Sequence, residues 1–231
     1  MDVGLRRTDA SLESKAKQSS WLHADNFVRR LGILLSGRGS NFLAIHRAIA
    51  DGRIRDAEIA VVISNKPEAA GLEVAQELGL PALAISQEGK GPEARALHDA
   101  KMIAALTDYG VELVCLAGYM RIITAAFVEA FPNRILNVHP SLLPAFPGLD
   151  AQHQAFEYGT KVAGCTVHFV DEAVDHGVII LQKTVAILDE DTADTLAARI
   201  LEQEHIAYPE AIARVLSGKY RVDGRRYLSV R

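Results

Sequence analysis

The chain has 231 residues, of which 49% are hydrophobic and 23% are charged, and its formal net charge is −4. These values are typical of one ordinary globular domain, and they exclude the broad basic surface of a nucleic-acid-binding protein. No apolar run reaches the length of a membrane-spanning helix. We therefore expect neither a nucleic acid nor a membrane as a partner.

Residues 1–30 are polar and contain acids, and they end in two arginines. They lack the apolar core of a secretory signal, and their acids are atypical of a transit peptide. We predict a disordered or loosely ordered N-terminal extension over 1–30, a single domain over 31–231 and a cytoplasmic location. Cys115 and Cys165 lie in apolar runs, as buried reduced thiols do, and no Cys/His arrangement indicates a metal site.

From residue 31 the chain alternates short apolar runs with amphipathic segments. The apolar runs predict strands over 31–35, 57–64, 82–85, 112–116 and 134–138. The amphipathic segments predict helices over 40–51, 67–78, 92–109 and 125–130. Strands that alternate with helices form a parallel sheet, so we predict an α/β fold with helices on both faces of a mostly parallel, twisted sheet.

The pattern changes after residue 160. Two longer apolar runs, over 161–171 and 178–186, predict antiparallel strands around the turn Asp175-His176-Gly177. Residues 192–216 predict one long helix, with Asp191 as the candidate N-cap, and residues 220–230 predict a terminal hairpin.

A glycine loop, Ser36-Gly37-Arg38-Gly39-Ser40-Asn41, joins the first strand to the first helix. Glycines let the backbone approach a ligand, and the first amides of a helix are unpaired donors at its positive end. A dinucleotide fingerprint would need a third glycine where Phe42 stands, and a P-loop would need Gly-Lys-Ser/Thr. The loop therefore indicates either a site for one phosphomonoester or a plain strand-to-helix turn.

The end of the fifth predicted strand carries the most informative residues, Asn137-Val138-His139-Pro140. Alternate residues share one face of a strand, so Asn137 and His139 point the same way, and Pro140 ends the strand. An amide donor beside a titratable ring can polarise a carbonyl and move a proton. Asp175 is either a structural turn residue or the carboxylate that faces His139 and keeps its ring protonated.

A third loop, over residues 116–122, follows the fourth strand. Ligands of open parallel sheets bind outside the carboxyl ends of the strands, and all three segments lie at that edge. We therefore expect one shared cleft, although Met120 could equally be a core residue and Arg121 a solvated charge.

Residues 31 to about 214 resemble the phosphoribosylglycinamide formyltransferases, a family that depends on formyltetrahydrofolate. The matching motifs are the glycine loop, residues 116–122, 137–148 and 164–170, and Gln203-Glu204-His205. The resemblance implies a Rossmann-like core with antiparallel C-terminal strands. It also implies transfer of a formyl group from 10-formyltetrahydrofolate to the amine of glycinamide ribonucleotide in de novo purine synthesis, without a metal, by a monomer or weak homodimer.

The resemblance assigns roles to individual residues. The implied catalytic residues are Asn137, His139 and Asp175. The implied ribonucleotide site consists of Gly39, Ser40, Asn41, Leu201, Glu202, Gln203 and Glu204. The implied folate site consists of Arg95, Met120, Arg121, Ile122, Ile123, Asn137, Asp171, Glu172, Ala173, Val174 and Asp175.

Two departures from the family's pattern stand out. In its members the catalytic aspartate is usually followed by glycine or threonine and then by Gly-Pro, whereas this chain has the sequence Asp175-His176-Gly177-Val178. His176 could therefore compete with His139 for the carboxylate. Some members also have a histidine at the position of Asp150.

Three rival functions follow from the same motifs. A formyltetrahydrofolate hydrolase usually has a regulatory domain ahead of this core and a histidine in place of Pro140, and 30 polar residues are too few for such a domain. A methionyl-tRNA formyltransferase would need a C-terminal RNA-binding barrel and a basic surface. A non-catalytic phosphosugar-binding module would keep the glycine loop without needing Asn137, His139 and Asp175 together.

Overall fold

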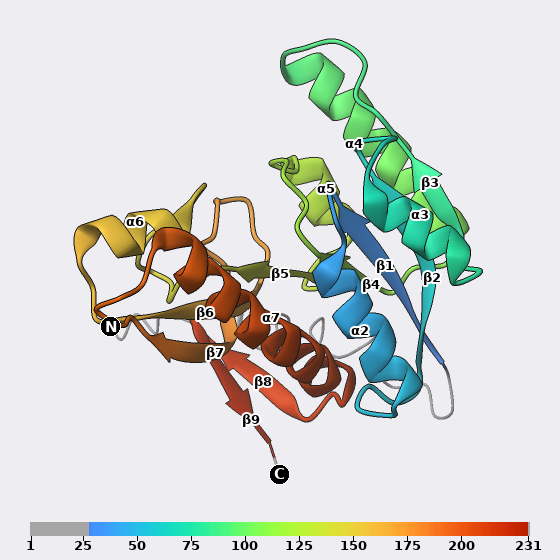
Figure 1. Cartoon of the computed structure of the whole chain (residues 1–231). Coiled ribbons are helices and arrows are strands. Elements are labelled where there is room, and N and C mark those ends of the chain that lie inside the picture. The colour runs from blue at the N-terminus through green and yellow to red at the C-terminus, as the bar shows by residue number, and fades with distance from the viewer. Residues whose placement is uncertain (1–27, 231) are drawn as a thin grey trace, which may run out of the picture.

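Nine strands form a single sheet over residues 28–230, the part of the chain that the computed structural model describes (Figure 1). In chain order they are β1 (Arg29–Leu35), β2 (Ala57–Ser64), β3 (Ala82–Ala84), β4 (Leu113–Leu116), β5 (Ile135–His139), β6 (Val162–Phe169), β7 (Ile179–Ala186), β8 (Tyr220–Asp223) and β9 (Arg226–Ser229). Their order in the sheet is β3-β2-β1-β4-β5-β6-β7-β9-β8. The first five are parallel, and β6 runs antiparallel to β5 and β7, which confirms the predicted sheet.

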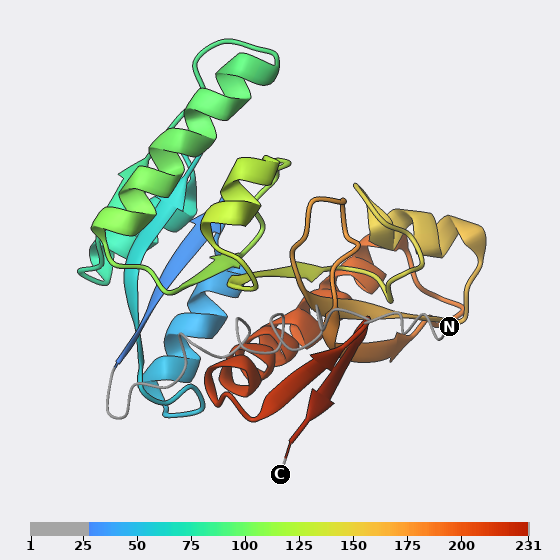
Figure 2. The same ribbon diagram turned by 180° about the vertical axis from the view of Figure 1, so that it is seen from behind.

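Helices cover both faces of this sheet, as predicted. They are α2 (Ser40–Ala50), α3 (Ala70–Glu77), α4 (Pro92–Asp108), α5 (Ala125–Ala130), α6 (Ala151–Tyr158) and α7 (Ala193–Leu216). One hydrophobic cluster includes residues of α2, α3 and α7, and a second includes residues of α4 and α5. Figures 1 and 2 show these two faces from opposite sides.

Burial on both faces explains the continuous apolar run of β1. Leu31, Ile33 and Leu35 belong to the cluster that includes α2 and α7, whereas Leu34 belongs to the cluster that includes α4 and α5. Successive side chains of a strand point to opposite faces, so a strand without a solvent-facing side shows no polar alternation. Because β1, β2, β4 and β5 are parallel, their carboxyl ends meet at one edge of the sheet.

Some element boundaries differ from the predictions. β1 begins at Arg29, two residues earlier than predicted, and α3 begins at Ala70 rather than at residue 67. The sequence analysis missed α6, because its only buried residues are the small Ala151 and Ala155, which give a weak apolar period. Of the predicted N-terminal extension, residues 1–27 lie outside the described part of the chain.

The N-cap of α7 is Thr192 and not Asp191. The Thr192 side chain accepts a hydrogen bond from the Thr195 N–H, and the Thr195 side chain accepts one from the Thr192 N–H, which completes a capping box. The Asp191 carboxylate instead accepts hydrogen bonds from the Leu188 N–H at 2.8 Å and from the Arg199 guanidinium. These two competing donor groups explain why an aspartate in the expected place does not cap the helix.

No helix within residues 28–230 is both long and apolar enough to cross a membrane. In the same range, no group of three or more His, Cys, Asp or Glu side chains is placed to hold a metal ion. Cys115 and Cys165 are buried and free, and burial raises the pKa of each thiol to about 12. Both thiols therefore stay protonated at neutral pH and are poor nucleophiles.

Candidate active site

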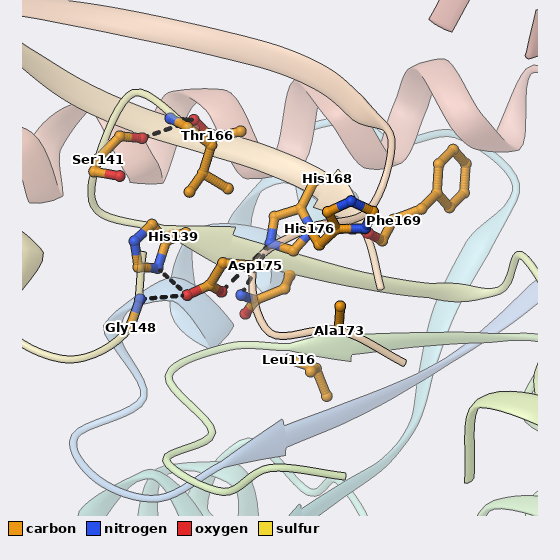
Figure 3. Close-up of polar contacts among 12 residues, drawn as sticks. Leu116, His139, Ser141, Gly148, Thr166, His168, Phe169, Ala173, Asp175 and His176 are labelled. Atoms are coloured by element: carbon orange, nitrogen blue, oxygen red, sulfur yellow. Dashed lines mark hydrogen bonds and ion pairs between the residues drawn. The ribbon is translucent and has the colours of Figure 1, made fainter. Parts of the chain in front are cut away.

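The end of β5 places the amide and the imidazole in one polar cluster, as their alternation predicts. His139 Nδ1 lies 3.4 Å from Asp175 Oδ2, although 36 positions separate the two residues in the chain. Asn137 Nδ2 lies 3.3 Å from His168 Nε2, and this ring nitrogen lies 3.8 Å from Asp175 Oδ1. Figure 3 shows His139, His168 and Gly148 arranged around the Asp175 carboxylate.

The connection between β6 and β7 carries Asp175 to this cluster. Asp175 has φ 51°, in the left-handed region that aspartate and asparagine tolerate better than most residues. A Cβ at Gly177 would lie 1.7 Å from the Phe169 carbonyl oxygen, so the connection closes this tightly only with glycine there. The Gly148 N–H donates to Asp175 Oδ2 at 2.7 Å and fixes the carboxylate.

Both ring nitrogens of His139 face hydrogen-bond acceptors. Nε2 lies 2.9 Å from the Phe146 carbonyl oxygen, so it carries a proton and donates to that oxygen. Nδ1 faces the Asp175 carboxylate at a longer distance of 3.4 Å. Only an imidazolium can donate to both acceptors, and the Nδ1 contact at 3.4 Å is the longer and weaker of the two.

His168 is a functional-site residue that the sequence analysis missed as an individual. It lies on β6, directly opposite Asn137 on β5, and is 1% exposed. Its Nδ1 lies 2.7 Å from the Phe169 carbonyl oxygen. Burial lowers the pKa of the His168 imidazole, which opposes protonation even though Asp175 is near.

Three loops meet at the carboxyl edge of the sheet, and two of them, the glycine loop and the loop after β4, belong to the predicted set. The Ser36 N–H donates to the Gly118 carbonyl oxygen at 3.0 Å, and the Met120 N–H donates to Ser36 Oγ at 2.8 Å. Ser36 Oγ also donates to Asn65 Oδ1 at 2.6 Å. One serine therefore joins the loops that follow β1, β2 and β4.

The glycine loop presents the first turn of α2 to this edge. Gly39 is the N-cap, with φ 76° and no side-chain cap, so Ser40 and Asn41 begin the helix rather than cap it. Their backbone amides belong to the positive end of the helix, where phosphates bind. A Cβ at Gly39 would lie 3.0 Å from Gly71 Cα, so glycine serves both the backbone conformation and the close packing of α3.

Asn41 joins the glycine loop to α7. Its Nδ2 donates to Glu204 Oε2 at 2.7 Å, and both side chains are buried. Burial raises the pKa of Glu204 to about 7, while the Asn41 hydrogen bond acts in the opposite direction. Asn41 Oδ1 is buried without a protein partner, so this pair can receive a further donor.

The Glu204→Gln variant should gain stability at high pH. Because the folded-state pKa is raised, the penalty for burying the charged Glu204 is absent below the unfolded pKa and grows as pH rises toward 7. We expect a gain on the order of 2 kcal/mol in the free energy of unfolding at pH 8 and none at pH 4. Urea titrations at both pH values measure it, with exposed Glu129→Gln as the unchanged control.

A cavity of about 230 Å³ lies between α2 and α7, beside the Asn41–Glu204 pair. It shares Ser40 with the glycine loop, but it contains none of the residues of the Asp175 cluster. His205 contributes to its wall, and the His205 Nε2 atom is buried without a partner. The lining residues are Ser40, Leu43, Ala44, Arg47, Arg53 and His205. This cavity is therefore separate from the Asp175 cluster at the strand ends.

The predicted folate residues lie mostly on two loops at the same edge. Met120 and Ile122 are 67% and 56% exposed, and Val174 on the facing loop is 53% exposed. Arg121 donates to Gln87 Oε1, and the Thr124 N–H donates to buried Asp99 at 2.7 Å, which holds the first loop to α4. The intervening Ile123 is partly buried against the second cluster, and Asp171, Glu172 and Ala173 lie at the surface of the second loop.

Arg95, a further predicted folate residue, lies on α4 rather than on these two loops. It is exposed in the first turn of α4, and the beginning of this helix projects beyond the sheet (Figure 1). The predicted ribonucleotide residues on α7 differ in burial. Leu201 and Gln203 are partly buried, Glu202 is exposed and Glu204 is buried.

His176 does not compete with His139 for Asp175. Its Nδ1 lies 2.9 Å from Asp171 Oδ2, and its Nε2 lies 2.9 Å from Arg225 Nη1. Arg225, in the turn between β8 and β9, also donates to the His176 carbonyl oxygen. The histidine that departs from the family's pattern therefore ties the Asp175 loop to the terminal hairpin.

Thr166 holds the loop after β5 in place. Its Oγ1 donates to the Ser141 carbonyl oxygen at 2.7 Å and accepts from the Leu143 N–H at 3.0 Å and from Gln182 Nε2 at 2.9 Å. The Thr166–Ser141 contact appears in Figure 3. Because the same loop supplies the Phe146 oxygen and the Gly148 N–H, Thr166 indirectly positions His139 and Asp175.

The Thr166→Val variant should therefore lose both stability and activity. It leaves a buried N–H and a carbonyl without their partner, each worth about 1–3 kcal/mol. We expect a fall of roughly 2–3 kcal/mol in the free energy of unfolding and a several-fold lower kcat. Chemical denaturation and steady-state kinetics test this, and Thr184→Val, on the exposed face of β7, should change neither. A fully stable variant would contradict the hydrogen-bond account.

The fold and this cluster place the chain in a known class: it belongs to the formyl transferase family, whose model matches residues 29–212. The resemblance expected from the motifs is therefore confirmed. The chain is 43% identical to phosphoribosylglycinamide formyltransferase of Bacillus subtilis, with 82% of this chain and 95% of that protein covered. Its structure matches the crystal structure of glycinamide ribonucleotide transformylase 1 from Symbiobacterium toebii with a TM-score of 0.84. The two sequences are 49% identical, and the match covers 90% of this chain and 96% of that chain.

A longer relative contains the same unit. The chain is 46% identical to part of the trifunctional purine biosynthetic protein adenosine-3 of Drosophila melanogaster, over 82% of this chain. The matched region is 14% of the length of that relative. The comparison therefore concerns one portion of a much longer protein.

Proposed function

We propose that this chain transfers the formyl group of 10-formyltetrahydrofolate to the amine of glycinamide ribonucleotide, a step of de novo purine (IMP) synthesis. The observation that carries the proposal is the cluster of Asn137, His139 and Asp175 at the end of β5, with both His139 nitrogens facing acceptors. The similarity to phosphoribosylglycinamide formyltransferase of Bacillus subtilis supports the same acceptor.

The first step is attack of the neutral acceptor amine on the formyl carbon. A bond forms between nitrogen and carbon, and negative charge develops on the formyl oxygen. Asn137 Nδ2–H and His139 Nδ1–H donate to that oxygen, and each such preorganised donor is worth about 10²–10³ in rate. No covalent bond to the enzyme is needed, which agrees with two cysteines whose thiols stay protonated.

The second step breaks the bond between the formyl carbon and N10 of the folate. The attacking nitrogen loses a proton and N10 gains one, so the two transfers balance. Asp175, fixed by the Gly148 N–H, keeps His139 cationic and can pass the proton through water. The products are formylglycinamide ribonucleotide and tetrahydrofolate.

Each substrate has a place at the same edge. The amides of Gly39, Ser40 and Asn41 hold the ribonucleotide phosphate, and Glu204 with Leu201, Glu202 and Gln203 lines the remainder of that site. The folate lies against the exposed apolar side chains of Met120, Ile122 and Val174. Exposed apolar patches at a site edge favour the binding of a planar ring. The other folate residues implied by the resemblance, including Arg95, remain predictions.

Several expectations remain predictions of this proposal. They are a cytoplasmic location, a monomer or weak homodimer, catalysis without a metal and the lack of nucleic-acid and membrane partners. The formyl-folate co-substrate is common to the formyl transferase family to which the chain belongs.

A formyl-transfer assay tests the proposed acceptor. The purified chain is given 10-formyltetrahydrofolate with glycinamide ribonucleotide, with water alone or with methionyl-tRNA. We expect tetrahydrofolate to form rapidly only with the ribonucleotide. Release of formate at the same rate without an amine would identify a hydrolase instead, and formylation of the tRNA would identify the other rival.

A further inference from the structure

We propose that His168 is a positioning residue that fixes the carboxamide of Asn137 for oxyanion stabilisation. The inference rests on the proposed function, and it assigns a role to a residue outside the three implied catalytic residues. The contacts that carry it join His168 to Asn137 across two strands and to the Phe169 carbonyl oxygen.

The contacts of His168 determine which of its nitrogens carries the proton. Nδ1 lies 2.7 Å from the Phe169 carbonyl oxygen, which can only accept, so Nδ1 is the donor. In a neutral ring the other nitrogen, Nε2, is then an acceptor. It lies 3.3 Å from Asn137 Nδ2, which has two N–H groups to give.

This tautomer decides the orientation of the Asn137 amide. If the amide were flipped, its oxygen would face the lone pair of His168 Nε2, and two acceptors would be in contact. With Nδ2 toward His168, one N–H is used by the ring and the second is free for the formyl oxygen. His168 therefore selects the orientation in which Asn137 is an oxyanion donor.

A neutral His168 also keeps Asp175 available to His139. His168 Nε2 is 3.8 Å from Asp175 Oδ1, too far for a hydrogen bond. A protonated His168 would be drawn to this carboxylate and would present an N–H to the Asn137 amide. The imidazole is 1% exposed and burial lowers its pKa, so the environment supports the neutral form that the contacts require.

The test is a double-mutant cycle on kcat. His168→Leu removes the acceptor and keeps an apolar side chain of similar bulk, and we expect kcat to fall roughly 10- to 100-fold while both KM values change less than about threefold. His168→Gln, whose side-chain oxygen can accept, should recover most of kcat. In an Asn137→Ala background, where there is no amide to position, His168→Leu should cost less than about twofold.

Several results would overturn the proposal. One is a wild-type kcat for His168→Leu. Another is a double variant in which the fold-losses in kcat of the two single variants multiply. The third is a kcat that does not recover in His168→Gln although this variant has an unchanged thermal unfolding profile. Imidazole ¹⁵N chemical shifts give a readout that does not depend on activity. They should show His168 protonated at Nδ1 and unprotonated at Nε2, and the opposite tautomer would refute the proposal even if the wild-type chain failed to formylate glycinamide ribonucleotide.

Discussion

The His139→Ala variant is expected to fold and to lose roughly 10³-fold in kcat. The imidazolium supplies the charged Nδ1–H donor beside the formyl oxygen, and its second N–H anchors the ring to the Phe146 carbonyl oxygen. Alanine removes the donor, the charge and the proton carrier together. Single-turnover formyl transfer measures the loss without interference from product release.

A matched histidine provides the control for this variant. His153 lies on α6 with 59% of its side chain exposed, and its charged neighbour is Glu157, at 3.7 Å. His153→Ala should therefore keep wild-type turnover. If His139→Ala retained more than about a tenth of the wild-type kcat, His139 would not be the principal oxyanion donor.

The residues that could be predicted from the sequence are those whose placement depends on local rules. Alternation along a strand puts Asn137 and His139 on one side of β5, and a helix that follows a glycine-rich turn must present free amides. The common edge of parallel strands then brings the loops after β1 and β4 together, as the Ser36 hydrogen bonds confirm. None of these predictions requires the distance in space between residues that are far apart in the sequence.

The contacts of Asp175 and His168 depend on strand register and on a turn, which local rules do not give. The pairing of β5 with β6 sets Asn137 opposite His168, and a shift of one residue would turn His168 to the other face. His168 lies in an apolar strand segment, where a histidine is usually a satisfied core residue, so composition alone does not mark it. The pairing of Asn41 with Glu204, 163 positions apart, is equally invisible before the fold is known.

The Asp175→Asn variant is expected to lose roughly 10²–10³-fold in kcat while keeping the loop intact. Asparagine tolerates the positive φ of this position, and its side-chain oxygen can still accept from the Gly148 N–H. The change therefore removes the negative charge that faces His139 and little else. Without that charge the His139 donor loses the opposite charge beside it, and steady-state formyl transfer measures the loss in kcat.

Two comparisons separate this electrostatic effect from a loss of structure. Asp189→Asn removes a carboxylate that is 96% exposed and should leave kcat unchanged. Asp175→Ala places a residue that tolerates positive φ poorly at the same turn, so it should lose thermal stability that Asp175→Asn retains. If Asp175→Asn turned over at the wild-type rate, the negative charge of this carboxylate would not contribute to catalysis.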